Sequence, residues 1–218
     1  MPKKLKIKIA PSLLSADFSC LAREIHKIES AGADMLHIDV MDGNFVPNIT
    51  IGPVVIKDIR KITKLPLDVH LMIKRPELLV DNFIAAGSDM ITLHIETISS
   101  AKCKAQGAKL KKKGIKLGIS LNPNTPLSKI KPVLSMVDFV LVMSVYPGFP
   151  GQKFIASVLP KIKQLRAIFK GDIAVDGGIN QNTARQVVRA GANVLAAGSY
   201  IFKAKNYHQV IRGLKCLT

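Results

Sequence analysis

The sequence lacks several features that define common protein classes. Its 218 residues include no Trp and only three Cys, which lie far apart and form no CxxC pair. A disulfide framework and a zinc site built from thiolates are therefore disfavoured, and a reducing compartment fits best. No apolar run reaches the ~18 residues that a membrane span needs, and the first nine residues do not resemble a signal peptide. We expect a cytoplasmic protein with no membrane partner.

Acidic residues are also scarce. The chain has 15 Asp and Glu against 32 Lys and Arg, which gives a formal net charge of +17. This excess suits anionic partners, such as nucleic acid or a phosphorylated small molecule. Residues 97–137 contain nine Lys, no acid and no aromatic side chain on which bases could stack, which is typical of a solvated basic face. Nucleic-acid binding is therefore a disfavoured alternative.

Apolar residues make up 48% of the chain, enough for one sizeable core. Short runs rich in Val, Ile and Leu alternate with longer segments of helical period, which predicts strands followed by crossover helices. The eight predicted strands are residues 7–11, 35–39, 66–71, 90–94, 116–121, 139–143, 172–176 and 194–197. We predict an α/β protein in which residues 1–218 form a single (β/α)8 TIM barrel.

The predicted helices support this count. The first begins after Asp17, its expected N-cap, with Phe18, Leu21, Ile25 and Ile28 on one face. The others are residues 53–61, 77–86, 101–113, 154–169 and 183–190. A short repeat, AGAD, AGSD and AGAN, precedes three of the strands at residues 31–34, 86–89 and 190–193, with a Gly suited to ending a helix. An open doubly wound sheet is disfavoured because no Gly-rich fingerprint follows the first strand.

Polar side chains gather at the carboxyl ends of three predicted strands, where barrel enzymes carry their reactive groups. His37 and Asp39 end the second strand, His70 the third and Asp176 the seventh. A strand period of two puts His37 and Asp39 on one side, beside His70. Such groups are costly to bury unless they are paired or bind metal. Two His and two Asp suit one divalent ion such as Zn, Fe, Co or Mn, although hydrogen-bonded core residues are the competing interpretation.

Other residues near the strand ends allow two interpretations each. Three Met, which fill a core or wall off a site from water, follow strands: Met41, Met72 and Met143. His94 ends the fourth strand with Glu96 two residues later, and we favour a structural or supporting role for this pair over an additional metal ligand. His26 and His208 are expected to be solvated.

Glycines after the last two strands predict a phosphate site. Gly177 and Gly178 follow the seventh strand, and Gly198 and Ser199 the eighth. Backbone N–H groups can converge on an anion there, aided by a helix N-terminus, and barrels often bind phosphate at these positions. Residues 146–152, YPGFPGQ, follow the sixth strand and are interpreted as a lid over the ligand. Ordinary turns and a plain connector are the alternatives.

The motifs together resemble the ribulose-phosphate 3-epimerase family over nearly the whole chain. The segments that carry the resemblance are APSLLSADF at 10–18, HIDVMDGNFVPN at 37–48, DVHLM at 68–72, MSVYPGF at 143–149 and VDGGI at 175–179. The resemblance implies a barrel enzyme that interconverts D-ribulose 5-phosphate and D-xylulose 5-phosphate. An epimerase acting on allulose 6-phosphate by the same mechanism is the alternative.

The resemblance also implies roles for residues. The metal would be held by His37, Asp39, His70 and Asp176, with Asp39 and Asp176 as the acid/base pair. Substrate would touch Ser12 and His70, and its phosphate would lie on Gly177, Gly178, Gly198 and Ser199. The chemistry requires one carboxylate to be ionised and the other protonated, so we expect their environments to push the two pKa values apart. The resemblance implies a homo-oligomer.

The lid departs from the family pattern. The family motif reads PGFGGQ, whereas this chain has Pro150 in place of a Gly. Proline has no backbone N–H and a fixed φ, so this position cannot donate to a phosphate and the lid is expected to move less freely. Gly148 and Gly151 remain candidate ligand contacts.

Overall fold

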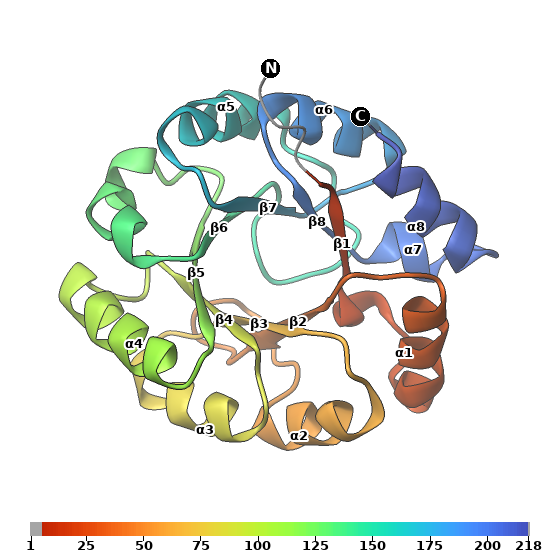
Figure 1. Ribbon diagram of the computed structural model, residues 1–218, viewed down its shortest axis with the longest axis horizontal. Coiled ribbons are helices and arrows are strands. Elements are labelled where there is room, and N and C mark those ends of the chain that lie inside the picture. Colours follow the sequence, from red (N-terminus) through yellow and green to blue (C-terminus); the bar gives the residue numbers. More distant parts are fainter. Residues whose placement is uncertain (1–5, 218) are drawn as a thin grey trace.

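The computed structural model describes residues 6–217 and forms a barrel of eight parallel strands ringed by helices (Figure 1). The strands are β1 Lys8–Pro11, β2 Leu36–Met41, β3 Leu67–Met72, β4 Met90–His94, β5 Lys116–Leu121, β6 Phe139–Met143, β7 Asp172–Asp176 and β8 Val194–Ala197. The sheet runs from β1 through β8 to β2, and a bridge between Ser12 and His37 joins its two ends. The predicted TIM barrel is confirmed, with five strands at the predicted bounds.

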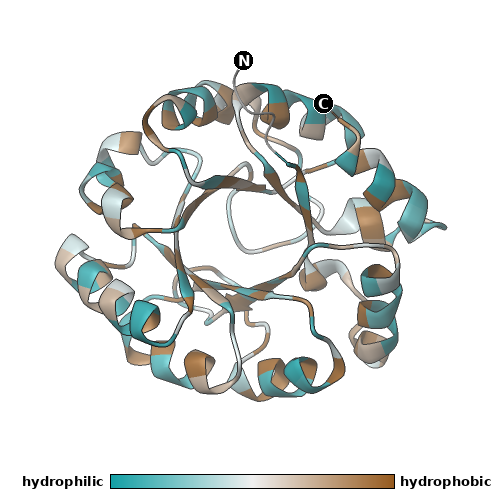
Figure 2. Ribbon diagram, in the orientation of Figure 1, coloured by the Kyte–Doolittle hydropathy of each residue, from teal (hydrophilic) through white to brown (hydrophobic). Residues whose placement is uncertain are grey.

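Helices cover the outside of the barrel. They are α1 Leu21–Ser30, α2 Pro53–Ile62, α3 Val80–Ala85, α4 Ser100–Lys112, α5 Leu159–Ile168, α6 Gln181–Ala190, α7 Ser199–Phe202 and α8 Tyr207–Lys215. The buried residues of the helices are mostly apolar and pack in one core with the strands, and hydrophilic residues alternate with hydrophobic ones along each helix (Figure 2). Between β5 and β6, two 3-10 helices, Leu127–Lys129 and Lys131–Met136, take the place of an α-helix. None of the helices over residues 6–217 has the length and hydropathy needed to cross a membrane.

Several helix predictions were wrong at the ends. Phe18 is 46% exposed and lies in a 3-10 helix, Phe18–Cys20, which Asp17 caps through the Ser19 N–H. The non-helical backbone of Cys20 separates this turn from α1. The predicted helix 77–86 is a 3-10 turn followed by the short α3. The predicted helix 154–169 begins later because the Ile155 N–H bonds to the Ser144 carbonyl at 2.8 Å. Helices α7 and α8 were missed.

The repeat before three strands has a structural function at the amino-terminal end of the barrel. Its glycines, at φ 87°, 94° and 115°, take the left-handed conformation that follows the helices. The side chain of its last residue accepts a hydrogen bond from a backbone N–H at the start of a neighbouring strand. Asp34 accepts from Ile9 at 2.8 Å, Asp89 from Leu67 at 2.9 Å and Asn193 from Ile173 at 2.9 Å. The starts of the strands are thereby fixed in register.

This register determines which side chains meet at the carboxyl ends. Asp39 of β2 lies opposite His70 of β3, and Met143 of β6 opposite Asp176 of β7. Below them the Phe139 ring fills the barrel interior over Gly118, where an added Cβ would come within 2.4 Å of the ring. The polar groups at the carboxyl ends of the strands therefore lie over a layer of packed apolar side chains.

Candidate active site

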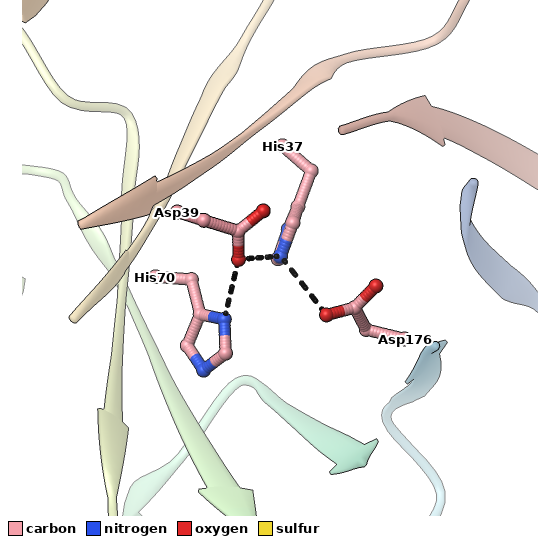
Figure 3. A group of neighbouring side chains, drawn as sticks. All are labelled: His37, Asp39, His70 and Asp176. Atoms are coloured by element: carbon pink, nitrogen blue, oxygen red, sulfur yellow. Dashed lines mark hydrogen bonds and ion pairs between the residues drawn. The ribbon is translucent and has the colours of Figure 1, made fainter. Parts of the chain in front are cut away.

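The four predicted metal ligands meet at the carboxyl end of the barrel (Figure 3). One ligand atom from each of His37, Asp39, His70 and Asp176 lies within 4.8 Å of the others. Asp39 Oδ1 lies 3.3 Å from His37 Nε2 and 3.1 Å from His70 Nδ1. Asp176 Oδ2 lies 3.9 Å from His37 Nε2. The two His and Asp39 are buried, whereas Asp176 is partly exposed.

His37 is oriented from behind by a residue that we had not assigned. Its Nδ1 lies 2.8 Å from Asp68 Oδ2, and the Thr92 hydroxyl donates to the other oxygen of Asp68 at 3.1 Å. A carboxylate on Nδ1 favours the tautomer with its proton there and a lone pair on Nε2. The sequence does indicate Asp68, because it lies two residues before His70 on the same strand and its side chain therefore also points into the barrel.

The centre of the cluster fits a cation. His37 Nε2 is buried and makes no hydrogen bond within residues 6–217, although two carboxylates lie nearby. A lone pair that faces carboxylate oxygens is unfavourable unless something positive lies between them. Two imidazole nitrogens and two carboxylates form a donor set that suits Zn, Fe, Co or Mn, so the residues present can hold such an ion.

The two carboxyl groups of the cluster have opposite pKa shifts, as expected. Burial would raise the pKa of Asp39, but the charge of His37 and the close contacts with His37 and His70 outweigh it and hold the pKa well below its usual range. Burial and the nearby charge of Asp39 raise the pKa of Asp176 to about 7. One carboxyl is therefore ionised at neutral pH while the other readily carries a proton.

The two histidines also differ. Burial lowers the pKa of His70 to about 4, which keeps its ring neutral at pH 7. Burial acts in the same direction on His37, but the charges of Asp39 and Asp68 outweigh it and raise the pKa of His37 well above its usual value. Without a metal ion, the cluster thus favours a second proton on His37, whereas a bound cation would take the place of that proton at Nε2.

A cavity that is open to solvent lies over the cluster. It is lined by most of the residues selected from the sequence: Ser12, Asp39, Met41, Met72, Met143, Gly148, Pro150, Gly151, Asp176, Gly177, Gly178, Gly198 and Ser199. The three Met are almost fully buried and provide aprotic walls. The Ser12 hydroxyl donates to Asp39 Oδ2 at 2.6 Å, so Ser12 contacts a carboxylate as well as the space for a ligand.

The glycine loops at the edge of this cavity leave backbone donors free. At Gly178 (φ 62°) an added Cβ would come within 2.7 Å of the Phe154 backbone, and at Gly198 within 2.5 Å of the Ser15 hydroxyl. Within residues 6–217 the N–H groups of Gly178 and Gly198 donate to no protein acceptor. At the N-terminus of α6 the Asn180 side chain accepts from the N–H groups of Asn182 and Thr183, whereas the N-cap of α7, Gly198, provides no side-chain cap.

The segment after β6 lies across the mouth of the barrel (Figure 1). The Asn48 amide donates to the Gly148 carbonyl at 2.7 Å, and the Gln152 amide donates to two carbonyls within the segment, those of Tyr146 and Phe149. Gly148 and Gly151 have φ values of 135° and 77°, which glycine adopts without strain. The segment is therefore fastened both internally and to the loop that follows β2.

The remaining histidines lie outside the cluster. His26 and His208 are exposed, as predicted. His94 is buried behind His70, with 2.8 Å between their Nε2 atoms, and its Nδ1 lies 3.0 Å from Glu96 Oε2. Neither His94 nor Glu96 belongs to the group of four converging side chains.

Comparison with known proteins agrees with this geometry. Residues 8–202 match the model of the Ribulose-phosphate 3 epimerase family. The ribulose-5-phosphate-3-epimerase, chloroplastic, of Arabidopsis thaliana is 50% identical, over 97% of this chain and 77% of its own length. The ribulose-phosphate 3-epimerases of Synechocystis sp. (49% identical, 96% of this chain and 93% of theirs) and Bacillus subtilis (48%, 96% and 98%) are similarly related.

Solved structures with low sequence identity share the fold. A 3-hexulose-6-phosphate synthase has a TM-score of 0.69 at 18% identity, with 98% of this chain and 99% of that chain covered. A tryptophan synthase α-subunit from Pyrococcus furiosus has a TM-score of 0.69 at 14% identity, with 98% of each chain covered. At such identities the likeness concerns the barrel alone. The family match and the nearly full-length relatives, in contrast, show that this chain belongs to the ribulose-phosphate 3-epimerase family.

Proposed function

We propose that this protein interconverts D-ribulose 5-phosphate and D-xylulose 5-phosphate by inverting C3, with one divalent cation held by His37, Asp39, His70 and Asp176. The observation that carries the proposal is the pair of carboxyl groups with opposite pKa shifts in one cluster. Inversion next to a ketone requires removal of a proton from one face of the carbon and delivery to the other. A base and an acid from different strands, β2 and β7, suit that reaction.

In the proposed reaction Asp39, which is ionised, removes the C3 proton, and Asp176 delivers its own proton to the other face. The two exchange roles in the reverse direction. A bound divalent cation would act as a Lewis acid that stabilises the negative charge developing on the substrate oxygens. Ser12 holds Asp39 by a hydrogen bond of 2.6 Å, and the Met walls exclude water, which strengthens the electrostatic interactions.

The substrate phosphate is proposed to lie on Gly177, Gly178, Gly198 and Ser199, where two N–H groups have no acceptor within residues 6–217 and where the Phe154 backbone leaves no room for a Cβ at Gly178. Ser12, His70, Gly148 and Gly151 are proposed as further substrate contacts. The names of the curated relatives favour the five-carbon substrate over allulose 6-phosphate. The homo-oligomer and the cytoplasmic location stay predictions.

The test is a reaction in D₂O with ribulose 5-phosphate. The xylulose 5-phosphate formed is expected to carry deuterium at C3, and protein stripped of metal by a chelator is expected to form none until a divalent cation is added back. Allulose 6-phosphate serves as the competing substrate, and a higher kcat/KM with it would reject the five-carbon assignment. Unchanged turnover after verified metal removal would reject the metal.

A further inference from the structure

A line of hydrogen bonds leads outward from the metal cluster through two residues that play no part in the proposed proton transfer. His70 Nε2 lies 2.8 Å from His94 Nε2, and His94 Nδ1 lies 3.0 Å from Glu96 Oε2. His94 is fully buried, and the centroids of the Phe45 and His94 rings lie 4.8 Å apart. Solvent therefore has little access to the middle of this line.

Glu96 determines which atoms donate and which accept along this line of hydrogen bonds. Its Oε1 accepts from the Asn122 backbone N–H at 2.8 Å and from the Thr125 hydroxyl. Burial would raise the pKa of Glu96, but the hydrogen bonds from His94 and Asn122 outweigh it and lower the pKa to about 2. An ionised carboxylate only accepts, so the proton between Glu96 and His94 belongs to His94 Nδ1.

The remaining protons follow from this one. Only one proton fits between the two Nε2 atoms, which lie 2.8 Å apart. The His94 tautomer with its proton on Nδ1 has a lone pair on Nε2 and accepts this proton from His70. His70 then carries its proton on Nε2, and its Nδ1 lone pair points at the cluster, 3.1 Å from Asp39 Oδ1. Two acceptors then face each other, the His70 Nδ1 lone pair and the Asp39 carboxylate.

We propose that Glu96 and His94 are positioning residues that fix the tautomer of His70, so that its Nδ1 lone pair faces the metal. This inference rests on the proposed metal site but not on the identity of the sugar. Asp68 does the same for His37 through a direct contact of 2.8 Å, whereas Glu96 acts on His70 through a second imidazole. Partners of this kind fix the orientation and raise the basicity of metal-ligating histidines.

The sharpest test is the isosteric variant Glu96→Gln. A Gln can still accept from the Asn122 N–H, but its NH₂ group would donate to His94 Nδ1. His94 would then donate from Nε2, and His70 would carry its proton on Nδ1, where the metal must bind. The affinity of the metal-free, full-length protein for Zn²⁺ alone, measured by chelator competition, is expected to fall about 10–100-fold.

The matched control is Thr125→Val, which removes one hydrogen bond to the same carboxylate and leaves the donors and acceptors along the line unchanged. Its Zn²⁺ affinity is expected to stay close to that of the unmodified protein. An equal loss in both variants, or none in Glu96→Gln, would overturn the proposal.

A second measurement decides the matter even if Glu96→Gln does not fold. Two-bond ¹H–¹⁵N spectra of the Zn²⁺-loaded protein, labelled at histidine, report which ring nitrogen carries each proton. We expect protons on His94 Nδ1 and His70 Nε2, and a proton on His94 Nε2 would refute the inference. Neither measurement uses substrate, so a failure of the epimerase assay with intact tautomers and affinities would reject the proposed function alone.

Discussion

Asp172 and Asp176 lie at the two ends of β7 and differ in what surrounds them. Asp172 accepts from the Lys8 ammonium at 2.6 Å and from the Asn193 amide at 2.7 Å, and these hydrogen bonds outweigh burial and lower its pKa. Asp176 faces Asp39, and burial together with that charge raises its pKa to about 7. The same residue type on one strand thus has opposite shifts.

The contrast extends to the two ends of the barrel. At the amino end, carboxylates such as Asp34 and Asp89 accept from backbone N–H groups of neighbouring strands and also pair with Lys215 and Arg60. At the carboxyl end, carboxylates and imidazole lone pairs face one another. The first arrangement stabilises the fold. The second is unfavourable without a bound cation, and such local conflicts are typical of functional sites.

The largest expected effect comes from removing the carboxyl group at one end of β7 and then at the other. Asp176→Asn cannot exchange a proton, so kcat/KM with ribulose 5-phosphate is expected to fall by about 10²–10⁴-fold. Asp172→Asn, far from the cluster, is expected to stay within about twofold of the unmodified enzyme. A coupled assay on both variants makes the comparison.

Equal losses of kcat/KM in Asp176→Asn and Asp172→Asn would contradict the assignment of catalysis to the carboxyl end of the barrel alone. Circular dichroism of each variant shows whether a loss of activity reflects a loss of fold. Residual activity of Asp176→Asn above the expected range would mean that another group supplies the proton.

The next effect is the stabilisation by metal. A ligand that binds only the folded state adds about 2.7 kcal/mol at a concentration one hundred times its Kd. The free energy of unfolding is therefore expected to rise with added Zn²⁺ or Mn²⁺, as measured by urea denaturation. Asp176→Asn is expected to lose most of this increase and Asp172→Asn none of it. A metal effect that survives in Asp176→Asn would place the cation elsewhere.

The pH dependence of stability should have opposite signs for the two residues in the metal-free protein. A raised pKa means that the folded state holds its proton after the unfolded state has lost it, so Asp176 costs stability as the pH rises from 4 to 7. Asp176→Asn is therefore expected to gain on the order of 2 kcal/mol relative to the unmodified protein between pH 5 and 8.

Asp172 should behave in the opposite way. Its lowered pKa contributes stability above the ordinary pKa of an aspartate, which is lost as the pH falls. At neutral pH Asp172→Asn is thus expected to be less stable than the unmodified protein, and denaturant midpoints at several pH values measure both differences. The same sign for both variants would refute the electrostatic contrast.

The sequence predicted the side chains at the carboxyl end of the barrel better than those at the amino end. His37, Asp39, His70 and Asp176 lie in predicted strands, and a period of two together with the barrel predicts that their side chains meet, although β2 and β3 continue two residues beyond Asp39 and His70. The glycines of the repeat before three strands predict helix ends, but the hydrogen bond from the neighbouring strand to its last residue depends on register, which no local pattern contains. Helix ends were missed for the same reason, because a long-range bond from Ile155 to Ser144 delays the start of α5.

The smallest expected effect tests whether the strand starts at the amino end of the barrel need only a hydrogen-bond acceptor or a negative charge as well. Asp138 Oδ2 accepts from the Leu117 N–H at 2.8 Å, just as Asn193 accepts from Ile173. Asp138→Ala leaves a partly buried donor unpaired and is expected to cost about 1 kcal/mol in the free energy of unfolding. Asp138→Asn keeps the acceptor and is expected to cost less, because Asn193, at the equivalent position before β8, already accepts from β7 in this way. Both should leave kcat/KM unchanged. If Asp138→Asn were as destabilising as Asp138→Ala, the charge would matter at the amino end too, and the difference between the ends would lie in the partners of the carboxylates alone.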